Sequence, residues 1–215
     1  MKLLCLDFDG VICDSAGETG ATGWRAAHQL WPGEFTTDPP ANYLADFRRL
    51  RPYLETGYES ILMARLWQAG VRQAGTAASY HELVRQEAEK SGQTRAALVA
   101  AFGGVRDQWL SERFGDWLAL HTFYPGTLAA LARWRAAGVS CQILTTKEQR
   151  FALALLRHGG LDWPPDQLFG LEDGPKPPRL QRLLAAYPAA NAHFVEDRLA
   201  TLQAVAARPD LSPYH

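Results

Sequence analysis

The chain has 215 residues, of which 47% are hydrophobic and 21% charged, the composition of a folded globular protein with one large core or two small ones. Its formal net charge of −1 argues against a broad nucleic-acid-binding surface, which needs an excess of lysine and arginine. No apolar run reaches the roughly 18 residues of a membrane helix, and acidic residues enter the N-terminal apolar stretch too early for a signal peptide, so we expect neither nucleic acid nor membrane as a partner.

The first predicted element is the apolar run Leu3–Leu6, which is typical of a strand buried on both faces. It ends in Asp7-Phe8-Asp9-Gly10, where acidic residues and a glycine replace apolar ones. The stretch from residue 15 to residue 122 has no buried-strand pattern, and its amphipathic periodicity predicts helices over 58–69, 80–90 and 94–102. We interpret this stretch as a helical insertion that folds as its own unit.

Proline and glycine mark the breaks that we predict inside the insertion. These breaks lie at Trp31-Pro32-Gly33, Asp38-Pro39-Pro40, Gly70, Gly75, Gly92 and Gly103-Gly104. The spacing of Ser15 and Glu18 matches a capping box, which predicts that the first helix of the insertion begins there.

After the insertion, predicted helices and strands alternate. Helices are predicted over 127–137, 148–158, 177–187 and 197–207, and strands over 139–144 and 192–195. The two strands end in polar residues, Thr145-Thr146 and Glu196-Asp197, as the first strand does. This alternation predicts an α/β fold with a parallel sheet, whose polar strand ends converge on one crevice.

Three cysteines, Cys5, Cys13 and Cys141, are an odd number without the spacing of a metal site. Cys5 and Cys141 lie in apolar, strand-like runs. We interpret them as buried thiols of a protein from the reducing cytoplasm rather than as redox groups.

Asp7 and Asp9 are the first candidate site residues. Two carboxylates two residues apart at a strand's end project to the same side, and each raises the proton affinity of the other unless a cation lies between them. Oxygen ligands of this kind suit Mg²⁺. The alternative is an ordinary acidic turn after a strand, in which Gly10 supplies a positive φ.

Each later polar strand end has a functional and a purely structural interpretation. Thr145 could donate a hydrogen bond to a phosphate, or it could cap a helix, because Thr145 and Glu148 have capping-box spacing. Lys176, just before a predicted helix, could attract an anion, or it could be an exposed lysine in a proline-rich loop. Asp197 could bind a metal with Glu196 as an outer-shell acceptor, or these acids could cap a helix or pair with an arginine.

Four segments in this order resemble the motifs of the haloacid dehalogenase superfamily. They are Leu6-Asp7-Phe8-Asp9-Gly10-Val11, Leu144-Thr145, Lys176-Pro177 and Val195-Glu196-Asp197. The resemblance covers about half of the chain, and Thr145-Thr146-Lys147 is most similar to the phosphoglycolate phosphatase branch. It implies a Rossmann-like core, residues 1–14 and 123–215, with a helical cap, residues 15–122, inserted after the first strand.

The resemblance also implies a role for each matching residue. Asp7 would be the nucleophile that attacks phosphorus, and Asp9 the general acid and base. Thr145 would bind the phosphoryl group, and Lys176 would hold both Asp7 and the phosphate. Mg²⁺ would be bound by Asp7, Asp197 and the backbone carbonyl of Asp9.

The same resemblance places Gly10 and Thr146 beside the substrate, and it leaves the last motif unsettled. Family members often have glycine where this chain has Glu196, and another aspartate where it has Thr201, so either Glu196 or Asp197 could bind the metal directly. Relatives also usually continue into a further strand where this chain stops, at 211–215, so we expect either a core short of one edge strand or a chain that is truncated before it.

The function expected from these residues is that of a Mg²⁺-dependent phosphatase, which hydrolyses a small phosphorylated metabolite through an aspartyl-phosphate. A phosphomutase on the same scaffold, or a metal-binding regulatory relative with little turnover, is the alternative. A carbon–halogen hydrolase is disfavoured, because those members of the family lack the second acid, Asp9.

Substrate selectivity is expected from the insertion, where Arg48, Arg49 and Arg51 group three guanidinium groups near a helix end. Arginine forks suit carboxylates or a second phosphate. We choose Arg51 as the candidate ligand, because it precedes a proline and is expected to be extended. The alternative is a solvated basic helix face.

Overall fold

The computed structural model describes residues 2–73, 75–187 and 191–206. The chain forms two compact units. The first, residues 1–14 with 122–215, we call the sheet unit, and the second, residues 15–121, we call the helical unit. The prediction about a further edge strand concerns the chain end at 211–215. This segment lies outside the described residues.

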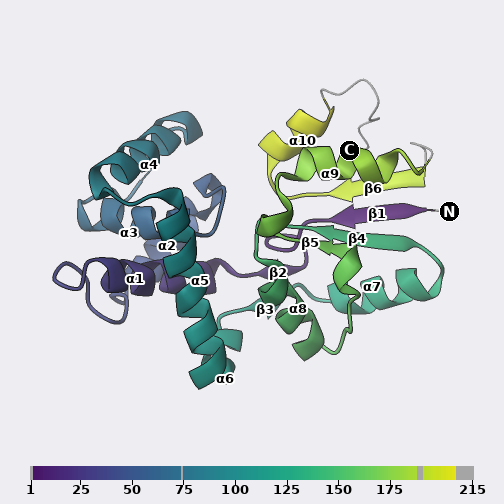
Figure 1. Ribbon diagram of the computed structural model, residues 1–215, viewed down its shortest axis with the longest axis horizontal. Helices are drawn as coiled ribbons and strands as arrows, with labels where there is room; N and C mark the ends of the chain where they lie inside the picture. Colours follow the sequence, from purple (N-terminus) through teal and green to yellow (C-terminus); the bar gives the residue numbers. More distant parts are fainter. Residues whose placement is uncertain (1, 74, 188–190, 207–215) are drawn as a thin grey trace. The chain divides into compact units, whose positions relative to one another are not determined.

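The sheet unit is a parallel sheet with helices on its two faces, which confirms the predicted α/β fold (Figure 1). Its elements are β1 (Leu3–Leu6), β2 (Cys13–Asp14), β3 (Thr122–Phe123), α7 (Thr127–Ala136), β4 (Ser140–Leu144), α8 (Gln149–His158), η2 (Pro165–Gln167), β5 (Leu168–Phe169), η3 (Leu171–Asp173), α9 (Lys176–Leu184), β6 (Ala192–Val195) and α10 (Leu199–Ala206). The strand order is β5-β4-β1-β6, and all pairs in this sheet are parallel.

β1 lies between the other long strands, with Leu3 opposite both Ser140 of β4 and Ala192 of β6. The chain runs outward from β1 to β4 and β5, and then returns across β1 to β6. The direction of winding therefore reverses beside β1. In sheets of this kind, ligands bind at such a reversal, outside the carboxyl ends of the strands.

The two faces of the sheet are covered by different helices: α9 and α10 lie on one side and α7 and α8 on the other (Figure 1). Leu3 and Cys5 of β1 pack with Leu144, Leu180 of α9 and Ala192 in one hydrophobic cluster. The three cysteines are free and buried, which confirms the burial predicted for Cys5 and Cys141.

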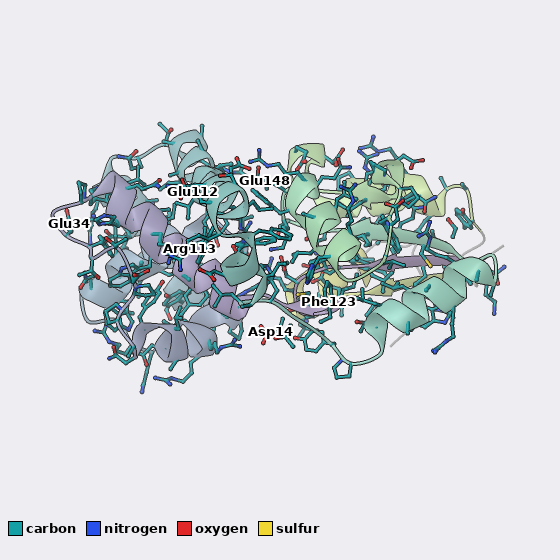
Figure 2. The ribbon with its side chains drawn as sticks, turned by 90° about the horizontal axis from the view of Figure 1, so that it is seen from below. Asp14, Glu34, Glu112, Arg113, Phe123 and Glu148 are labelled. Carbon is teal, nitrogen blue, oxygen red and sulfur yellow. The ribbon has the colours of Figure 1, made fainter. Side chains whose placement is uncertain are left out.

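The chain leaves the sheet unit after Asp14 and re-enters it at Thr122. At this point β2 and β3 form an antiparallel pair, with Cys13 opposite Phe123 and Asp14 opposite Thr122. Figure 2 labels Asp14 and Phe123, one on each of these strands. The outgoing and returning segments are thus tied together by backbone hydrogen bonds.

The helical unit contains α1 (Ala16–Leu30), α2 (Tyr43–Leu50), η1 (Arg51–Tyr53), α3 (Glu59–Gln68), α4 (Ala77–Ser91), α5 (Arg95–Glu112) and α6 (Phe114–Leu118). Its core is aromatic. The ring of Trp24 lies 4.8 Å from that of Tyr43, 5.7 Å from that of Trp67 and 5.0 Å from that of Phe35, centroid to centroid. Such pairs stabilise a core by roughly 0.5–1.5 kcal/mol each beyond their burial.

The predicted break at Gly103-Gly104 is wrong, because α5 continues through both glycines to Glu112. A glycine inside a helix costs about 1 kcal/mol relative to alanine. The second half of α5 offsets this cost by burying Val105, Arg106 and Trp109. Although α5 has 18 residues, no helix in the described part of the chain is both long and apolar enough to cross a membrane.

The predicted capping box at Ser15 and Glu18 is also wrong. Ser15 is the N-cap of α1, but its side chain makes no capping hydrogen bond. Glu18 is fully buried, and its carboxylate accepts hydrogen bonds from Arg106 Nε (2.7 Å) and Nη2 (2.6 Å), and also from Thr22 and Trp117. The bidentate pair with Arg106 takes Glu18 away from the end of its own helix.

Replacing Arg106 by leucine is expected to destabilise the protein by about 3–5 kcal/mol, because it leaves the buried Glu18 carboxylate without its cation. Urea unfolding followed by circular dichroism would measure the loss. Arg85→Leu is the matched control, since Arg85 pairs with Glu82 and Glu89 on an exposed face and should change little. Equal, small changes in both variants would show that the buried pair does not stabilise the fold.

Candidate active site

The candidate site lies at the carboxyl ends of β1, β4 and β6 and begins with Asp7. The backbone N–H of Asp7 donates to the carbonyl of Val195 (2.9 Å), and its Oδ1 accepts from the N–H of Phe8 (2.7 Å). Phe8 is fully buried in the core. The Asp7 carboxylate is thereby held in one place at the end of the central strand.

Lys176 reaches this carboxylate from the first residue of α9. Its Nζ lies 2.9 Å from Oδ1 of Asp7 and 2.7 Å from Oε2 of Glu196. The interpretation of Lys176 as an exposed loop lysine is wrong, because it is only 9% exposed. Burial alone would lower the pKa of Lys176, but the two carboxylates outweigh it and raise the pKa, so the ammonium is kept charged.

Burial raises the pKa of Asp7 to about 7, against the lowering effect of the Lys176 ammonium. The neighbouring carboxylate of Glu196 adds to the rise. An acid in such a place binds a proton readily unless further positive charge is brought to it. The site therefore favours a bound cation next to Asp7.

Three carboxylates could provide the ligands for this cation. One oxygen each of Asp7, Glu196 and Asp197 lies within 4.8 Å of the others. The Glu196 carboxylate is already engaged on both oxygens, since Oε2 accepts from Lys176 and Oε1 accepts from the backbone N–H of Arg198 (3.1 Å). Asp197 is exposed. The donor set fits a hard divalent ion such as Mg²⁺, with Asp7 and Asp197 as the better placed ligands.

Gly10 is required by its contact with Asp197. Its φ is +86°, and a Cβ at this position would lie 2.2 Å from Oδ2 of Asp197. Any other residue would be strained and would displace the carboxylate. The role of Gly10 in this site is to let Asp197 come close to the turn after β1.

Asp9 is not one of the three clustered carboxylates found among the described residues, which are those of Asp7, Glu196 and Asp197. Its Oδ1 lies 3.3 Å from Nζ of Lys147, whose side chain is 1% exposed. Sequence analysis missed Lys147 as a site residue. Part of its signal was the one that drew attention to Lys176, a lysine just ahead of a predicted helix, and Lys147 also follows closely on a predicted strand end.

Thr145 directly follows β4 and is buried, and its backbone N–H donates to the carbonyl of Phe169 (2.9 Å). The helix-cap interpretation of Thr145 is wrong, because α8 begins only at Gln149, with Glu148 as its N-cap. The Thr145 hydroxyl oxygen instead accepts from the backbone N–H of Lys147 (3.1 Å), and its own hydrogen can still be donated. Thr146, next in the loop, is half-buried.

Arg51 lies in the helical unit and is half-buried. Its predicted extended conformation is wrong: φ is −52° and ψ −37°, because its N–H donates to the carbonyl of Phe47 at the end of α2. Pro52 then fits the first turn of η1. Arg49 pairs with Asp46 of its own helix, so it does not join a shared anion site with Arg51.

A sequence model of haloacid dehalogenase-like hydrolases matches residues 1–207. The chain belongs to the haloacid dehalogenase-like hydrolases. This hydrolase matches no curated protein sequence. The recognition that rested on four short motifs is confirmed over nearly the whole chain.

Solved structures agree with this assignment of the hydrolase. A protein from Lactobacillus delbrueckii subsp. bulgaricus, provisionally named a phosphoglycolate phosphatase, is 17% identical with a TM-score of 0.58, over 94% of this chain and 83% of that one. A predicted phosphoglycolate phosphatase from Haemophilus somnus is 14% identical with a TM-score of 0.55, over 90% and 76%. A subfamily IA hydrolase of the superfamily from Geobacter sulfurreducens is 16% identical with a TM-score of 0.54, over 98% and 84%. At these identities the likeness establishes the fold.

Proposed function

We propose that this hydrolase is a Mg²⁺-dependent phosphatase that acts on a small phosphorylated metabolite through an aspartyl-phosphate on Asp7. The observation that carries the proposal is the Asp7 carboxylate, fixed at the switch point of the sheet with the Lys176 ammonium 2.9 Å away. A carboxylate nucleophile beside a cation suits attack on a phosphate ester, because phosphoryl transfer depends on positioning and charge neutralisation.

In the first half of the proposed reaction, Asp7 forms a bond to phosphorus while the bond from phosphorus to the ester oxygen breaks. Asp9 gives its proton to the departing oxygen. In the second half, Asp9 takes a proton from water, whose oxygen attacks phosphorus, and the bond to Asp7 breaks to release phosphate. Lys176 holds Asp7 in place, and the Thr145 hydroxyl donates to the phosphoryl group.

The remaining assignments concern the cation and the substrate. Asp7, Asp197 and the backbone carbonyl of Asp9 would hold Mg²⁺. Glu196 would orient the Lys176 ammonium toward Asp7 by pairing with it. When bound, Mg²⁺ supplies charge neutralisation for the phosphoryl oxygens. Gly10 and Thr146 would line the phosphate position with their backbones. The helical unit would act as the cap that selects the substrate.

The test is release of inorganic phosphate from a panel of metabolite phosphates with Mg²⁺ present, with 4-nitrophenyl phosphate as a generic ester. We expect hydrolysis of several esters and a preferred substrate. Phosphate that moves within a sugar phosphate would identify a mutase, and no turnover of any ester would contradict the proposal. In the same screen, Arg51→Ala should lower kcat/KM for the preferred substrate about ten- to hundredfold and leave the generic ester unchanged, whereas Arg49→Ala should change neither.

A further inference from the structure

Lys147 is a buried cation to which neither the fold nor the proposed chemistry gives a role so far. Its side chain is 1% exposed, and Nζ lies 3.3 Å from Oδ1 of Asp9, whose side chain is 13% exposed. Burying an ammonium in a protein is unfavourable unless a carboxylate compensates it. The Lys147 ammonium is therefore compensated by the Asp9 carboxylate, and the two side chains form a pair.

The backbone of Lys147 is held from two directions. Its N–H donates to the hydroxyl oxygen of Thr145 (3.1 Å), and its carbonyl accepts from the N–H of Leu171 (3.0 Å). A Cβ on Gly170 would lie 2.9 Å from the same carbonyl oxygen, so the loop approaches η3 closely. The backbone from which the Lys147 side chain extends is thus fixed, so the loop itself determines that the ammonium lies beside Asp9.

The site contains two pairs of one aspartate and one lysine. Lys176 pairs with Asp7 at 2.9 Å, and Lys147 pairs with Asp9 at 3.3 Å. The two aspartates have different tasks in the proposed reaction, since Asp7 attacks phosphorus and Asp9 carries the proton. Each of these two aspartates therefore has its own lysine ammonium beside it.

We propose that Lys147 is a positioning residue for Asp9, an inference that rests on the proposed phosphatase function. Its ammonium contacts Oδ1 and fixes the rotation of the carboxyl group, so that Oδ2 is the oxygen that hands the proton to the leaving oxygen. Lys147 itself does not contact the reacting atoms in this assignment. Its effect is therefore confined to reactions that need the proton from Asp9.

The test compares two classes of ester by kcat/KM, which reports the reaction only as far as transfer of the phosphoryl group to Asp7. An alkyl phosphate has a poor leaving group that must be protonated, whereas 4-nitrophenyl phosphate leaves without a proton. Lys147→Met should lower kcat/KM for the alkyl ester by about ten- to hundredfold and that for the aryl ester by less than about threefold. Lys147→Arg should recover part of the alkyl activity, and Lys90→Met, on the exposed face of α4, should change neither.

A double-mutant cycle makes the inference specific to Asp9. In an Asp9→Asn background, Lys147→Met should cause no further loss on the alkyl ester, because the group that it positions is gone. A full additional loss in that background, an equal loss on both ester classes, or no loss on either would each overturn the inference. If Lys147→Met fails to fold, Lys147→Gln keeps the chain length and polarity close and is expected to show the same difference between ester classes.

The outcomes separate this inference from the function on which it rests. Wild-type protein that hydrolyses neither ester class would overturn the phosphatase proposal and the role of Lys147 with it. Wild-type protein that hydrolyses both classes, with additive effects of the Asp9 and Lys147 substitutions, would overturn only the role of Lys147.

Discussion

An Asp7→Asn variant is expected to lose phosphate release by on the order of 10⁴-fold or more, because a carboxamide is a poor nucleophile and cannot form the aspartyl-phosphate. It also removes one of the two carboxylates that hold Lys176. Phosphate release from the preferred ester would measure the loss. Asp166→Asn, on the exposed turn η2, is the control and should behave like the parent.

Binding of a phosphate analogue tests the same residue without turnover. Beryllium fluoride mimics a phosphoryl group on an aspartate, and it should raise the melting temperature of the parent through mass action but not that of Asp7→Asn. Turnover in Asp7→Asn comparable to that of the parent would rule out Asp7 as the nucleophile. Binding of the analogue to Asp7→Asn would place the phosphoryl group elsewhere.

An Asp197→Asn variant is expected to lose activity by roughly a hundredfold or more, because it removes a direct ligand of the proposed cation, and even outer-shell changes at metal sites cost about 10–100-fold. Mg²⁺ should raise the melting temperature of the chelator-treated parent and restore its activity, and it should do neither in Asp197→Asn. Asp166→Asn is again the control. Full activity of the metal-free parent would contradict the need for a cation.

The raised pKa of Asp7 predicts how this Mg²⁺ effect depends on pH. In the metal-free protein the pKa of Asp7 is about 7, above its ordinary value of 3.8. The folded state thus binds the proton more tightly than the unfolded state, so the contribution of Asp7 to stability falls as pH rises from about 4 through 7. Mg²⁺ competes with that proton, so its apparent affinity should drop by up to about tenfold per pH unit below 7 and level off above it. Mg²⁺ titrations followed by melting temperature at several pH values would measure this.

The three longest strands, β1, β4 and β6, were predictable because their signal is local. Leu3–Leu6 is a continuous apolar run, Ala192–Val195 is apolar except for His193, and the structure has strands at these bounds. Each run ends where the polar residues begin, and in β1, which is buried between two strands, a carboxylate inside the run would have no water to solvate it. The three strand ends that carry the candidate site could thus be located from the sequence.

The errors arose where a distant residue outweighed a local pattern. Glu18 has the spacing of a capping box, but Arg106, 88 residues away, takes its carboxylate. The same pair helps α5 to pass through Gly103. Lys147 was missed for a related reason: its partner Asp9 lies on another strand end, and local sequence does not contain that proximity. The choice between Glu196 and Asp197 as the proposed metal ligand also depends on a distant residue, because the Lys176 ammonium at the start of α9 pairs with Glu196.

The pairing of β2 with β3 has a consequence for the order in which the chain folds. β1 and β4 are neighbours in the sheet although roughly 130 residues lie between them, and closing so long a loop is entropically unfavourable. Once the helical unit has formed, its ends are already close, with Glu18 3.7 Å from His121, and Cys13 can pair with Phe123. The loop that remains to be closed falls to roughly 30 residues, which lowers its entropic cost by about 1.4 kcal/mol. The helical unit should therefore fold first and bring the strands of the sheet together. During refolding, the amides of α1 should then gain protection from hydrogen exchange before those of β1.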